Sequence, residues 1–340
     1  MAAEVLEKRG RGRSPGTHSK KCGGRDFFLS ASLLSVFIVT VYWKQSRACP
    51  ERTDVFDDIA KDYDNTATQS LYSNWTAGGD INKADFLALQ RLFDIFNELE
   101  MFNGHDPVII GGTNEGQLSE IILKLYPQLL FYGFEIQPDV YERVKDKLSS
   151  FPHAKVLNVG MSDKELSDIP IGGAGEVAGL FDPDGQRGWK LSSKRATIVR
   201  LTDWSDKNKI YRVLYLVIDT EGHAPKVIRG MDLRDEMNQL RFNLFQFELG
   251  GTWAEQDNRH GKDAWTQLVT ARHLEKCGYD LFLIGPKKWL YIRAEFFHVD
   301  NNPAMLDEGF GPFVQGNLLA MHSSTSKELR KRVLANTQIL

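Results

Sequence analysis

Carboxylates stand at the ends of several short apolar runs in this sequence. Glu135 closes "FYGFE", Glu248 closes "LFQFE", and Asp219 and Glu221 follow "LYLVI". If these runs are strands of one parallel sheet, their carboxyl ends meet at the crevice where open α/β sheets bind ligands. Carboxylates there can accept hydrogen bonds from hydroxyl groups, take up a proton or attract a cation. The spacing therefore predicts a pocket for a neutral or cationic ligand that bears hydroxyl groups.

A glycine turn in "VIIGGTNEGQ" narrows this prediction. Thr113 stands where a dinucleotide fingerprint has its second glycine, and no Gly-Lys-Ser/Thr of a P-loop follows. Glu115 is favourable at the positive start of a helix, but its charge would repel a phosphate. Glu135 can accept hydrogen bonds from both hydroxyls of a ribose. A ribose without a pyrophosphate, joined to a sulfonium cation, is what S-adenosylmethionine offers.

The elements that must position these residues alternate between apolar runs and helical patterns, in the manner of a parallel sheet. A helical stretch begins near Asn82. The candidate strands that follow it are residues 108–111, 129–135, 155–160, 213–219 and 244–249. A glycine-rich stretch near 163–200 has little periodicity, and we interpret it as an insertion on the ligand side. The sequence thus predicts an α/β fold with a Rossmann-like, doubly wound, mostly parallel sheet.

Five stretches, in this order and spacing, resemble the FkbM-type S-adenosylmethionine-dependent methyltransferases, whose domain is of the class I type. They are "VIIGGTNEGQ", "FYGFEIQPDVYERVKDKL", "VLNVGMSDKE", "LYLVIDTEGHAPKVIRGM" and "LFQFEL". The resemblance covers about residues 106–283, and "IDTEGH" with "VIRGM" is its most specific part. Two positions depart from the family's pattern: Ile110 replaces the usual acid of the first motif, and Ala224 replaces a glutamate.

The resemblance implies a cofactor site for S-adenosylmethionine. The residues that would contact the cofactor are Gly112, Thr113, Asn114, Gly116, Glu135, Ile136, Met161, Ser162 and Asp219. Within this set, Glu135 would hold the ribose, while Met161 and Ser162 would flank the adenine. Asp219 and Glu221 match the family's paired acids.

Methyl transfer to a hydroxyl group needs a group that takes up the hydroxyl proton. The candidates are Asp219, Glu221, His223 and Glu248. A divalent metal held by the carboxylates is a second way to activate the hydroxyl, but the sequence contains no dedicated ligand loop, so metal dependence stays open. The expected acceptor is a glycan or another sugar-containing molecule. Trp253, His260 and Trp265 follow the fifth strand and can stack on a sugar.

Two other functions fit parts of the sequence. A Golgi-type glycosyltransferase would use the Asp182-x-Asp184 pair for a metal and a sugar nucleotide, although "FDPDG" is also ordinary turn chemistry. A non-catalytic, membrane-anchored binding protein would explain why Ile110 replaces the usual acid. Cofactor affinity separates this binding protein from both enzymes, and sugar-nucleotide binding separates the two enzymes from each other.

The N-terminus predicts a membrane anchor. Residues 27–43 contain no charge and follow a basic tail, and the larger number of Lys and Arg on the N-terminal side indicates that this side is cytosolic. The predicted organisation is a tail at 1–26, a transmembrane signal anchor at 27–43, a stem at 44–81 and the methyltransferase domain at 82–340. This describes a single-pass type II protein of the Golgi or another secretory-pathway membrane. The alternative is secretion after signal-peptide cleavage near Ala48.

Composition adds few constraints on partners. A net charge of −3 and 42% hydrophobic residues describe an ordinary globular protein without the basic surplus of a nucleic-acid-binding protein.

Asn74 begins an N-x-S/T sequence, which can receive a glycan if the domain is lumenal. Cys22 would face the cytosol, Cys49 and Cys277 could meet in the lumen, and Cys277 is expected to be a buried thiol. The oligomeric state is not indicated.

Overall fold

A computed structural model describes residues 64–70, 81–172, 179–180, 191–249, 266–285, 287–297, 306–307, 311–312 and 316–338. These residues all belong to one compact unit, Ser46–Leu340. The predicted tail, the membrane anchor at 27–43, Cys22, Cys49 and Asn74 lie outside the described residues, as do Asp182, Asp184, Trp253, His260 and Trp265. Within the described part of the chain, no helix has the length and apolarity that crossing a membrane requires.

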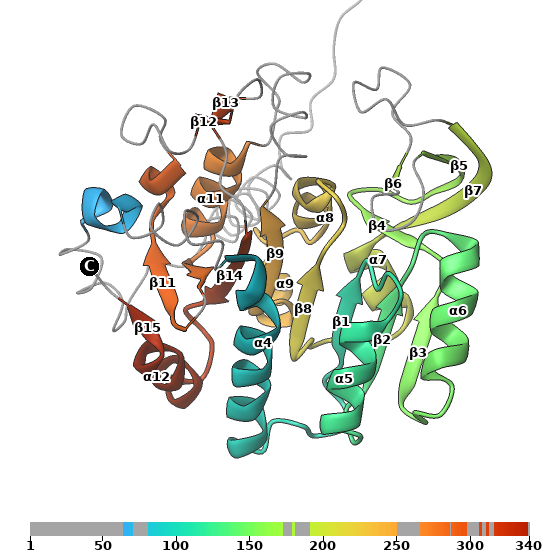
Figure 1. The fold of residues 1–340 in the computed structure, drawn as a ribbon, viewed down its shortest axis with the longest axis horizontal. Helices are drawn as coiled ribbons and strands as arrows, with labels where there is room; N and C mark the ends of the chain where they lie inside the picture. Colours follow the sequence, from blue (N-terminus) through green and yellow to red (C-terminus); the bar gives the residue numbers. More distant parts are fainter. Residues whose placement is uncertain are drawn as a thin grey trace, which may run out of the picture. The chain divides into compact units, whose positions relative to one another are not determined.

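A nine-stranded sheet forms the centre of this unit, in the order β15-β11-β10-β14-β9-β8-β1-β2-β3 (Figure 1). Five adjacent strands run parallel to one another: β1 (Val108–Gly111), β2 (Phe131–Phe134), β3 (Ala154–Leu157), β8 (Tyr215–Ile218) and β9 (Leu244–Leu249). The chain order reverses between β1 and β8, which is the switch point where doubly wound sheets bind ligands. The predicted Rossmann-like, mostly parallel sheet is therefore confirmed.

The far half of the sheet contains the antiparallel pairings. β14 (Gly316–His322) lies between β9 and β10 (Tyr279–Ile284) and runs antiparallel to both. β11 (Trp289–Ile292) continues the sheet, and β15 (Thr337–Gln338) forms its last strand. The short strands β12 (Leu306–Asp307) and β13 (Gly311–Pro312) form a separate pair.

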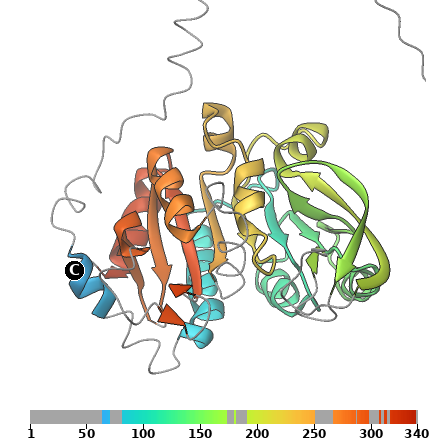
Figure 2. The same ribbon diagram turned by 90° about the horizontal axis from the view of Figure 1, so that it is seen from above.

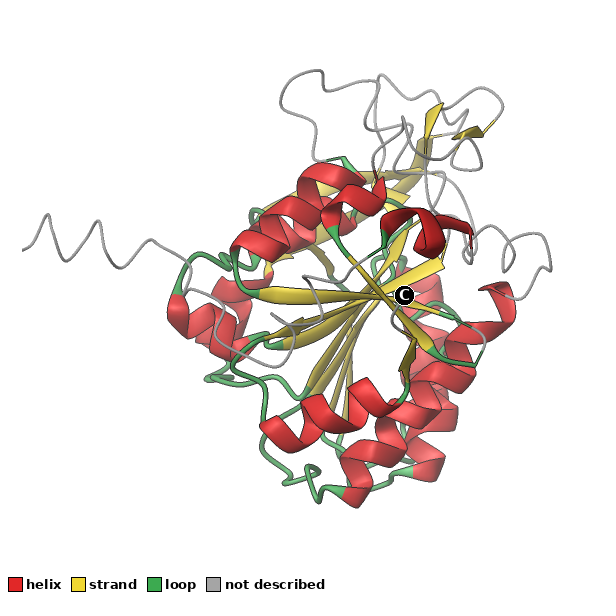
Figure 3. Ribbon diagram, turned by 90° about the vertical axis from the view of Figure 1, so that its left-hand side faces the viewer, coloured by secondary structure: helices red, strands yellow, loops and turns green. Residues whose placement is uncertain are grey.

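Helices cover both faces of the sheet (Figure 3), because alternate residues of each central strand point into different cores. Val108 and Ile110 pack with α4 (Ile81–Glu98), α5 (Gln117–Leu125), α6 (Pro138–Leu148) and α12 (Lys327–Ala335). Ile109 packs with α7 (Leu201–Lys207), α8 (Ala224–Gly230) and α11 (Gln267–Lys276). The helix α9 (Glu236–Arg241) precedes β9. Burial on both faces explains why β1 and β8 are continuous apolar runs.

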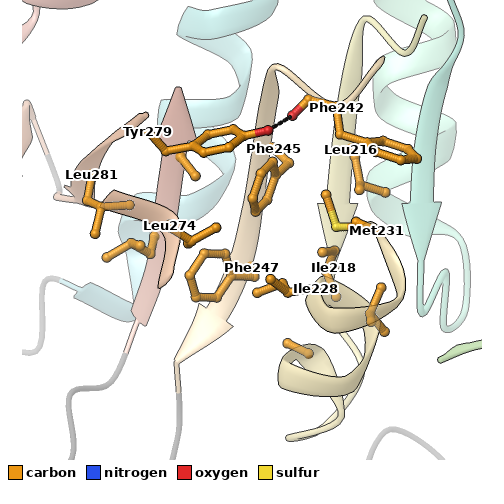
Figure 4. Packing of buried hydrophobic residues seen from close by; sticks show 14 of the residues in the cluster. Leu216, Ile218, Ile228, Met231, Phe242, Phe245, Phe247, Leu274, Tyr279 and Leu281 are labelled. Carbon is orange, nitrogen blue, oxygen red and sulfur yellow. Dashed lines mark hydrogen bonds between the residues drawn. The ribbon is translucent and has the colours of Figure 1, made fainter. Parts of the chain in front are cut away.

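In the core that contains Ile109, aromatic side chains of β9 and β10 pack together with aliphatic side chains that include Ile228 of α8 (Figure 4). The Phe245 and Tyr279 rings meet edge to face, with their centroids 5.4 Å apart. The Tyr279 hydroxyl donates a hydrogen bond of 3.0 Å to the Phe242 carbonyl, so the polar end of this buried ring is satisfied. Cys277 lies in the same core as a buried thiol, as predicted.

A small second sheet contains the end of the predicted strand 155–160 and most of the predicted insertion near 163–200. β4 (Gly160–Ser162), β7 (Leu191–Arg200), β5 (Leu166–Gly172) and β6 (Gly179–Leu180) form it in that order. The predicted strand 155–160 is therefore wrong at its end, because the large sheet stops at Leu157 and Gly160 begins a strand of the small sheet. The insertion near 163–200 supplies β5 and β7, and Figures 1 and 2 show this sheet beside β1, β2 and β3.

Part of the predicted stem packs on the folded unit. Residues 65–70 are helical, and the Asp64 side chain caps them by accepting the Thr66 and Ala67 N–H groups at 2.9 and 3.0 Å. Gln69 is buried, and its Nε2 donates to the Phe296 carbonyl at 3.2 Å in the 3-10 helix η3 (Ala294–Phe297). Asn65 Nδ2 donates to the neighbouring Glu295 carbonyl. The domain boundary at 82 stays a prediction, but residues 64–70 contact the domain.

We expect a fragment that starts at residue 82 to be less stable than one that starts at Ser46. Removing residues 64–70 loses two hydrogen bonds, each worth about 0.5–1.5 kcal/mol, together with the burial of Thr68 and Gln69. The expected loss is about 1–3 kcal/mol, measured as the free energy of unfolding in urea. Gln69→Ala in the longer fragment should reproduce part of the loss. Equal stabilities of the two fragments would show that this contact contributes nothing.

Candidate active site

The glycine turn after β1 lies directly against the end of β8. Gly112 has a φ of 83°, and a Cβ placed on it would stand 1.7 Å from the Asp219 carbonyl oxygen. Its N–H and that of Thr113 both donate to the Phe134 carbonyl, at 2.9 and 3.1 Å. Only glycine allows both the positive φ and this close approach. The turn therefore joins the ends of β1, β2 and β8 at the switch point.

The Glu135 carboxylate holds the turn in place through hydrogen bonds with backbone N–H groups. Its Oε2 accepts the Asn114 N–H and its Oε1 accepts the Gln137 N–H, both at 2.9 Å. Burial raises the pKa of the Glu135 carboxyl, and the Gln137 and Asn114 N–H groups oppose that rise. The residue is 3% exposed, so a ribose would reach only the remaining lone pairs of this carboxylate. The predicted ribose contact stays a prediction, while a structural role in the turn is visible.

The charge of Glu115, which was expected to repel a phosphate, is paired in the structure. Its carboxylate forms an ion pair with Arg143 of α6 at 2.6 Å, and Arg143 holds the pKa of Glu115 below its usual range. Lys147 donates to the Glu115 carbonyl at 2.6 Å. Because Arg143 offsets the carboxylate charge, Glu115 is a weaker argument against a phosphate than the sequence suggested. The case against a phosphate then rests on Thr113 in place of the fingerprint glycine and on the carboxylates Asp219, Glu221 and Glu248.

Met161 and Ser162, predicted to flank the adenine, and Ile136, predicted to contact the cofactor, have partners inside the protein. Met161 is buried, and its terminal methyl lies over Gly111, where a Cβ would stand 1.8 Å from it. Ile136 is partly buried and packs on Ile171 and Ala196 of the small sheet. The Ser162 hydroxyl lies 3.0 Å from His223 Nε2. These contacts leave the predicted contacts with the adenine untested.

Three of the four predicted catalytic residues come together. Asp219, Glu221 and Glu248 each offer a carboxylate oxygen, and these oxygens lie within 4.8 Å of one another. Asp219 and Glu221 follow β8, whereas Glu248 lies in the neighbouring strand β9. Glu221 has a φ of 50°, a conformation that costs free energy in a residue other than glycine and is often found at functional sites. The sheet thus assembles the predicted acids at one edge.

This arrangement suits two chemical roles. A carboxylate of the cluster that lies beside an acceptor hydroxyl can take up its proton as a general base. The same oxygens are ligands that a hard divalent cation accepts. The geometry of the cluster alone permits both roles.

The structure adds an ion pair that the sequence analysis did not single out, and a detail of the predicted residue Thr113. Arg229 Nε lies 2.9 Å from Asp163 Oδ2, which links α8 to the end of β4. Its only signal in the sequence was its place in "VIRGM". The Thr113 Oγ1 is buried and has no hydrogen-bond partner among the described residues. A buried hydroxyl without a partner in the glycine turn fits a polar ligand held there.

Comparison with known proteins gives similarity in structure alone. Neither known protein families nor curated proteins match this sequence. A precorrin-6y C5,15-methyltransferase from Geobacter metallireducens is 10% identical, aligned over 64% of this chain and 80% of its own, with a TM-score of 0.29. An rRNA methylase from Streptococcus thermophilus is 12% identical, aligned over 71% of this chain and 93% of its own, with a TM-score of 0.33. An S-adenosylmethionine-dependent methyltransferase from Aquifex aeolicus is 12% identical, aligned over 63% of this chain and 93% of its own, with a TM-score of 0.30.

The resemblance to the FkbM type stays a prediction after these comparisons. The function proposed below rests on the strand order and on the residues of the site.

Proposed function

We propose that this chain is an S-adenosylmethionine-dependent methyltransferase of the FkbM type that methylates a hydroxyl group. The observation that supports it most is the glycine turn at the switch point, which lies against Asp219 and is fastened by Glu135. This turn lacks the dinucleotide fingerprint and is surrounded by carboxylates, which suits a sulfonium cation better than a pyrophosphate. The sheet order β3-β2-β1-β8-β9 is that of a doubly wound nucleotide-binding fold.

The residues of the turn fit this cofactor. Gly112 admits a ligand close to the backbone, and the Thr113 hydroxyl is a buried donor and acceptor available to it. Asp219 is exposed beside the turn and can attract the positive charge. Bound here, S-adenosylmethionine would supply a methyl group on a sulfonium centre.

The chain contributes positioning and proton removal to the reaction. Holding the acceptor in line with the methyl group can supply about 7–11 kcal/mol of the barrier. A general base adds about 100- to 10,000-fold. Asp219, Glu221 and Glu248 are close enough to serve one acceptor hydroxyl together, either as base or as ligands of a divalent ion. We therefore place the acceptor hydroxyl beside this cluster.

The acceptor and the compartment are proposed from the sequence. A single-pass type II protein anchored through residues 27–43 would place the domain in the secretory lumen, where glycans are in transit. We therefore propose a glycan hydroxyl as the acceptor.

The central experiment is incubation of the protein with methyl-labelled S-adenosylmethionine and separate panels of glycans, lipids, proteins and small metabolites. Label in the glycan fraction is expected. Label in another fraction would refute the glycan but keep the methyltransferase. If the protein fails to bind the cofactor but binds a sugar nucleotide, the glycosyltransferase alternative is supported. Failure to bind either would favour the non-catalytic binding protein.

The proposed topology predicts glycosylation of Asn74. In cells with a secretory pathway, endoglycosidase treatment should increase the electrophoretic mobility of the protein, because the N-x-S/T sequence would be lumenal. Asn74→Gln should remove this shift, and Thr76→Ser, which keeps the acceptor sequence, is the matched control. A protein that stays unglycosylated, with a C-terminus digested by protease outside sealed vesicles, would contradict the topology.

A further inference from the structure

Two of the three carboxylates in the cluster belong to residues that the large sheet holds. Asp219 directly follows β8, and its N–H donates to the Gly111 carbonyl at 2.9 Å. Glu248 lies within β9, which pairs with β8 on one side and with β14 on the other. Hydrogen bonds between strands therefore set the backbone of these two residues relative to each other.

Glu221, which supplies the third carboxylate, lies outside the sheet. It is part of the turn between β8 and α8, has a φ of 50° and precedes Gly222, whose φ is 81°. His223 is the N-cap of α8, and its N–H donates to the Thr220 carbonyl at 3.1 Å. Because the turn is short, the place of Glu221 beside Asp219 depends on where α8 begins.

The small sheet contacts α8 at both ends of the helix. At its start, His223 Nε2 lies 3.0 Å from the hydroxyl of Ser162, the last residue of β4. Near its end, Arg229 Nε lies 2.9 Å from Oδ2 of Asp163, the residue that follows β4. The position of α8 is thus tied to the small sheet at two points.

The end of α8 also packs against β4 through the backbone. A Cβ on Gly230 would stand 2.2 Å from the Ser162 carbonyl oxygen, so any other residue would force the helix or the strand to shift. Thr202 of α7 donates from Oγ1 to the Gly230 carbonyl at 3.0 Å, and Arg200, the last residue of β7, pairs with Asp232 after the helix. Figure 1 shows β4 beside α8. Such close packing leaves α8 little freedom to move.

We infer that the small sheet positions Glu221. Asp163 and Gly230 are the positioning residues, because they hold α8 against β4 and α8 sets where the turn that carries Glu221 ends. The small sheet then brings the third carboxylate to the two that the large sheet holds. The catalytic consequence rests on the methyltransferase function proposed above, whereas the dependence of the turn on the small sheet does not.

Hydrogen–deuterium exchange of the full chain tests this dependence without any methyl transfer. Gly230→Ala forces α8 away from β4, and Asp163→Lys replaces the attraction to Arg229 by repulsion. Each change should speed exchange at least about fivefold in peptides that cover 219–230, because this segment opens more often. Peptides that cover 244–249 should exchange as before. Unchanged exchange at 219–230 in both variants would overturn the proposal, and Asp163→Lys alone decides if Gly230→Ala does not fold.

Glu142→Lys is the matched control for the charge reversal. Glu142 is an exposed acid of α6 that pairs with Lys145 at 3.2 Å, an ion pair that does not involve α8. This variant should keep the exchange pattern at 219–230 and the rate of methyl transfer. An equal change of exchange in Glu142→Lys and Asp163→Lys would show that the contact with α8 is not the cause, and would overturn the proposal.

Turnover in combined variants separates the positioning of Glu221 from a general structural role. Rates are measured with methyl-labelled S-adenosylmethionine and the acceptor fraction that takes up label. Gly230→Ala should lower kcat by about 10- to 100-fold and Asp163→Lys by at least about fivefold, while the Kd for S-adenosylmethionine stays within a few fold. In protein that already carries Glu221→Gln, each change should cost less than about twofold, because no carboxylate is left to misplace.

The possible failures are distinguishable. A full additional loss of kcat in the combined variants, or an unchanged kcat in variants whose exchange at 219–230 is faster, would refute the catalytic part. If the unaltered protein transfers no methyl group, the proposed function fails, and the exchange experiment still tests whether the small sheet positions the turn.

Discussion

Replacing Glu221 by Gln or Asp219 by Asn is expected to slow methyl transfer by about 100- to 10,000-fold, or roughly 3–5 kcal/mol in activation free energy. Both changes are nearly isosteric, so they remove the charge and the basic oxygen without leaving a cavity. Each residue contributes an oxygen to the cluster that also contains Glu248. We therefore expect Glu248→Gln to reduce the rate as well. Rates are measured under saturating cofactor and acceptor.

Cofactor affinity should distinguish the two acids. The Asp219 side chain is exposed beside the turn, where its charge can attract the sulfonium, so Asp219→Asn can weaken both cofactor binding and turnover. Glu221→Gln should leave the Kd for the cofactor within a few fold. Glu328→Gln, an exposed glutamate on α12, is the control for a lost surface charge. If all three site variants keep full rate, the base lies elsewhere, with His223 and His260 as the next candidates.

Removal of divalent ions separates the two roles of this cluster. If the carboxylates act as metal ligands, a chelator should abolish turnover and added Mg²⁺ or Mn²⁺ should restore it. If one of them is the base, the chelator should have no effect, and the loss in Glu221→Gln should persist at every metal concentration. The same preparation serves both measurements, so the outcome assigns the role directly.

Glu135→Ala is the second change with a large expected effect. The substitution removes two backbone hydrogen bonds to a charged acceptor, each worth about 1.5–3 kcal/mol. The Asn114 and Gln137 N–H groups lose their acceptor, while the hydrogen bonds from Gly112 and Thr113 to the Phe134 carbonyl of β2 remain. We expect at least about tenfold weaker binding of S-adenosylmethionine by calorimetry, because the turn is no longer preorganised.

The pH dependence of stability gives an independent test of Glu135. Burial raises the pKa of its carboxyl, so the folded protein favours the neutral form relative to the unfolded chain. The stability from this group is fully present below the unfolded pKa and is lost as pH rises through the folded pKa. Glu135→Ala should lack this step in the free energy of unfolding. Glu142→Gln, which changes an exposed acid on α6, should keep this step. For the binding test, unchanged cofactor affinity in Glu135→Ala would remove the turn from the proposed mechanism.

The sequence by itself determined the strands and the edge where the acids gather. The apolar runs of β1, β2, β8 and β9 are local signals of burial, and parallel strands place their carboxyl ends at one edge. Gathering Asp219 and Glu221 with Glu248 therefore needed only the assumption of a shared sheet. The glycines of the turn could also be recognised from the sequence, because a positive φ is a local requirement that favours glycine.

Only the tertiary structure decided which partner each polar side chain has. Glu115 is paired with Arg143 because α6 packs beside the turn, and Ser162 meets His223 because Gly230 lets α8 approach β4. The split of the predicted strand 155–160 between two sheets, and the contact of Gln69 with Phe296, likewise join residues far apart in the chain. Periodicity reports whether a segment is buried, whereas these contacts depend on how separate elements pack, which no local pattern contains.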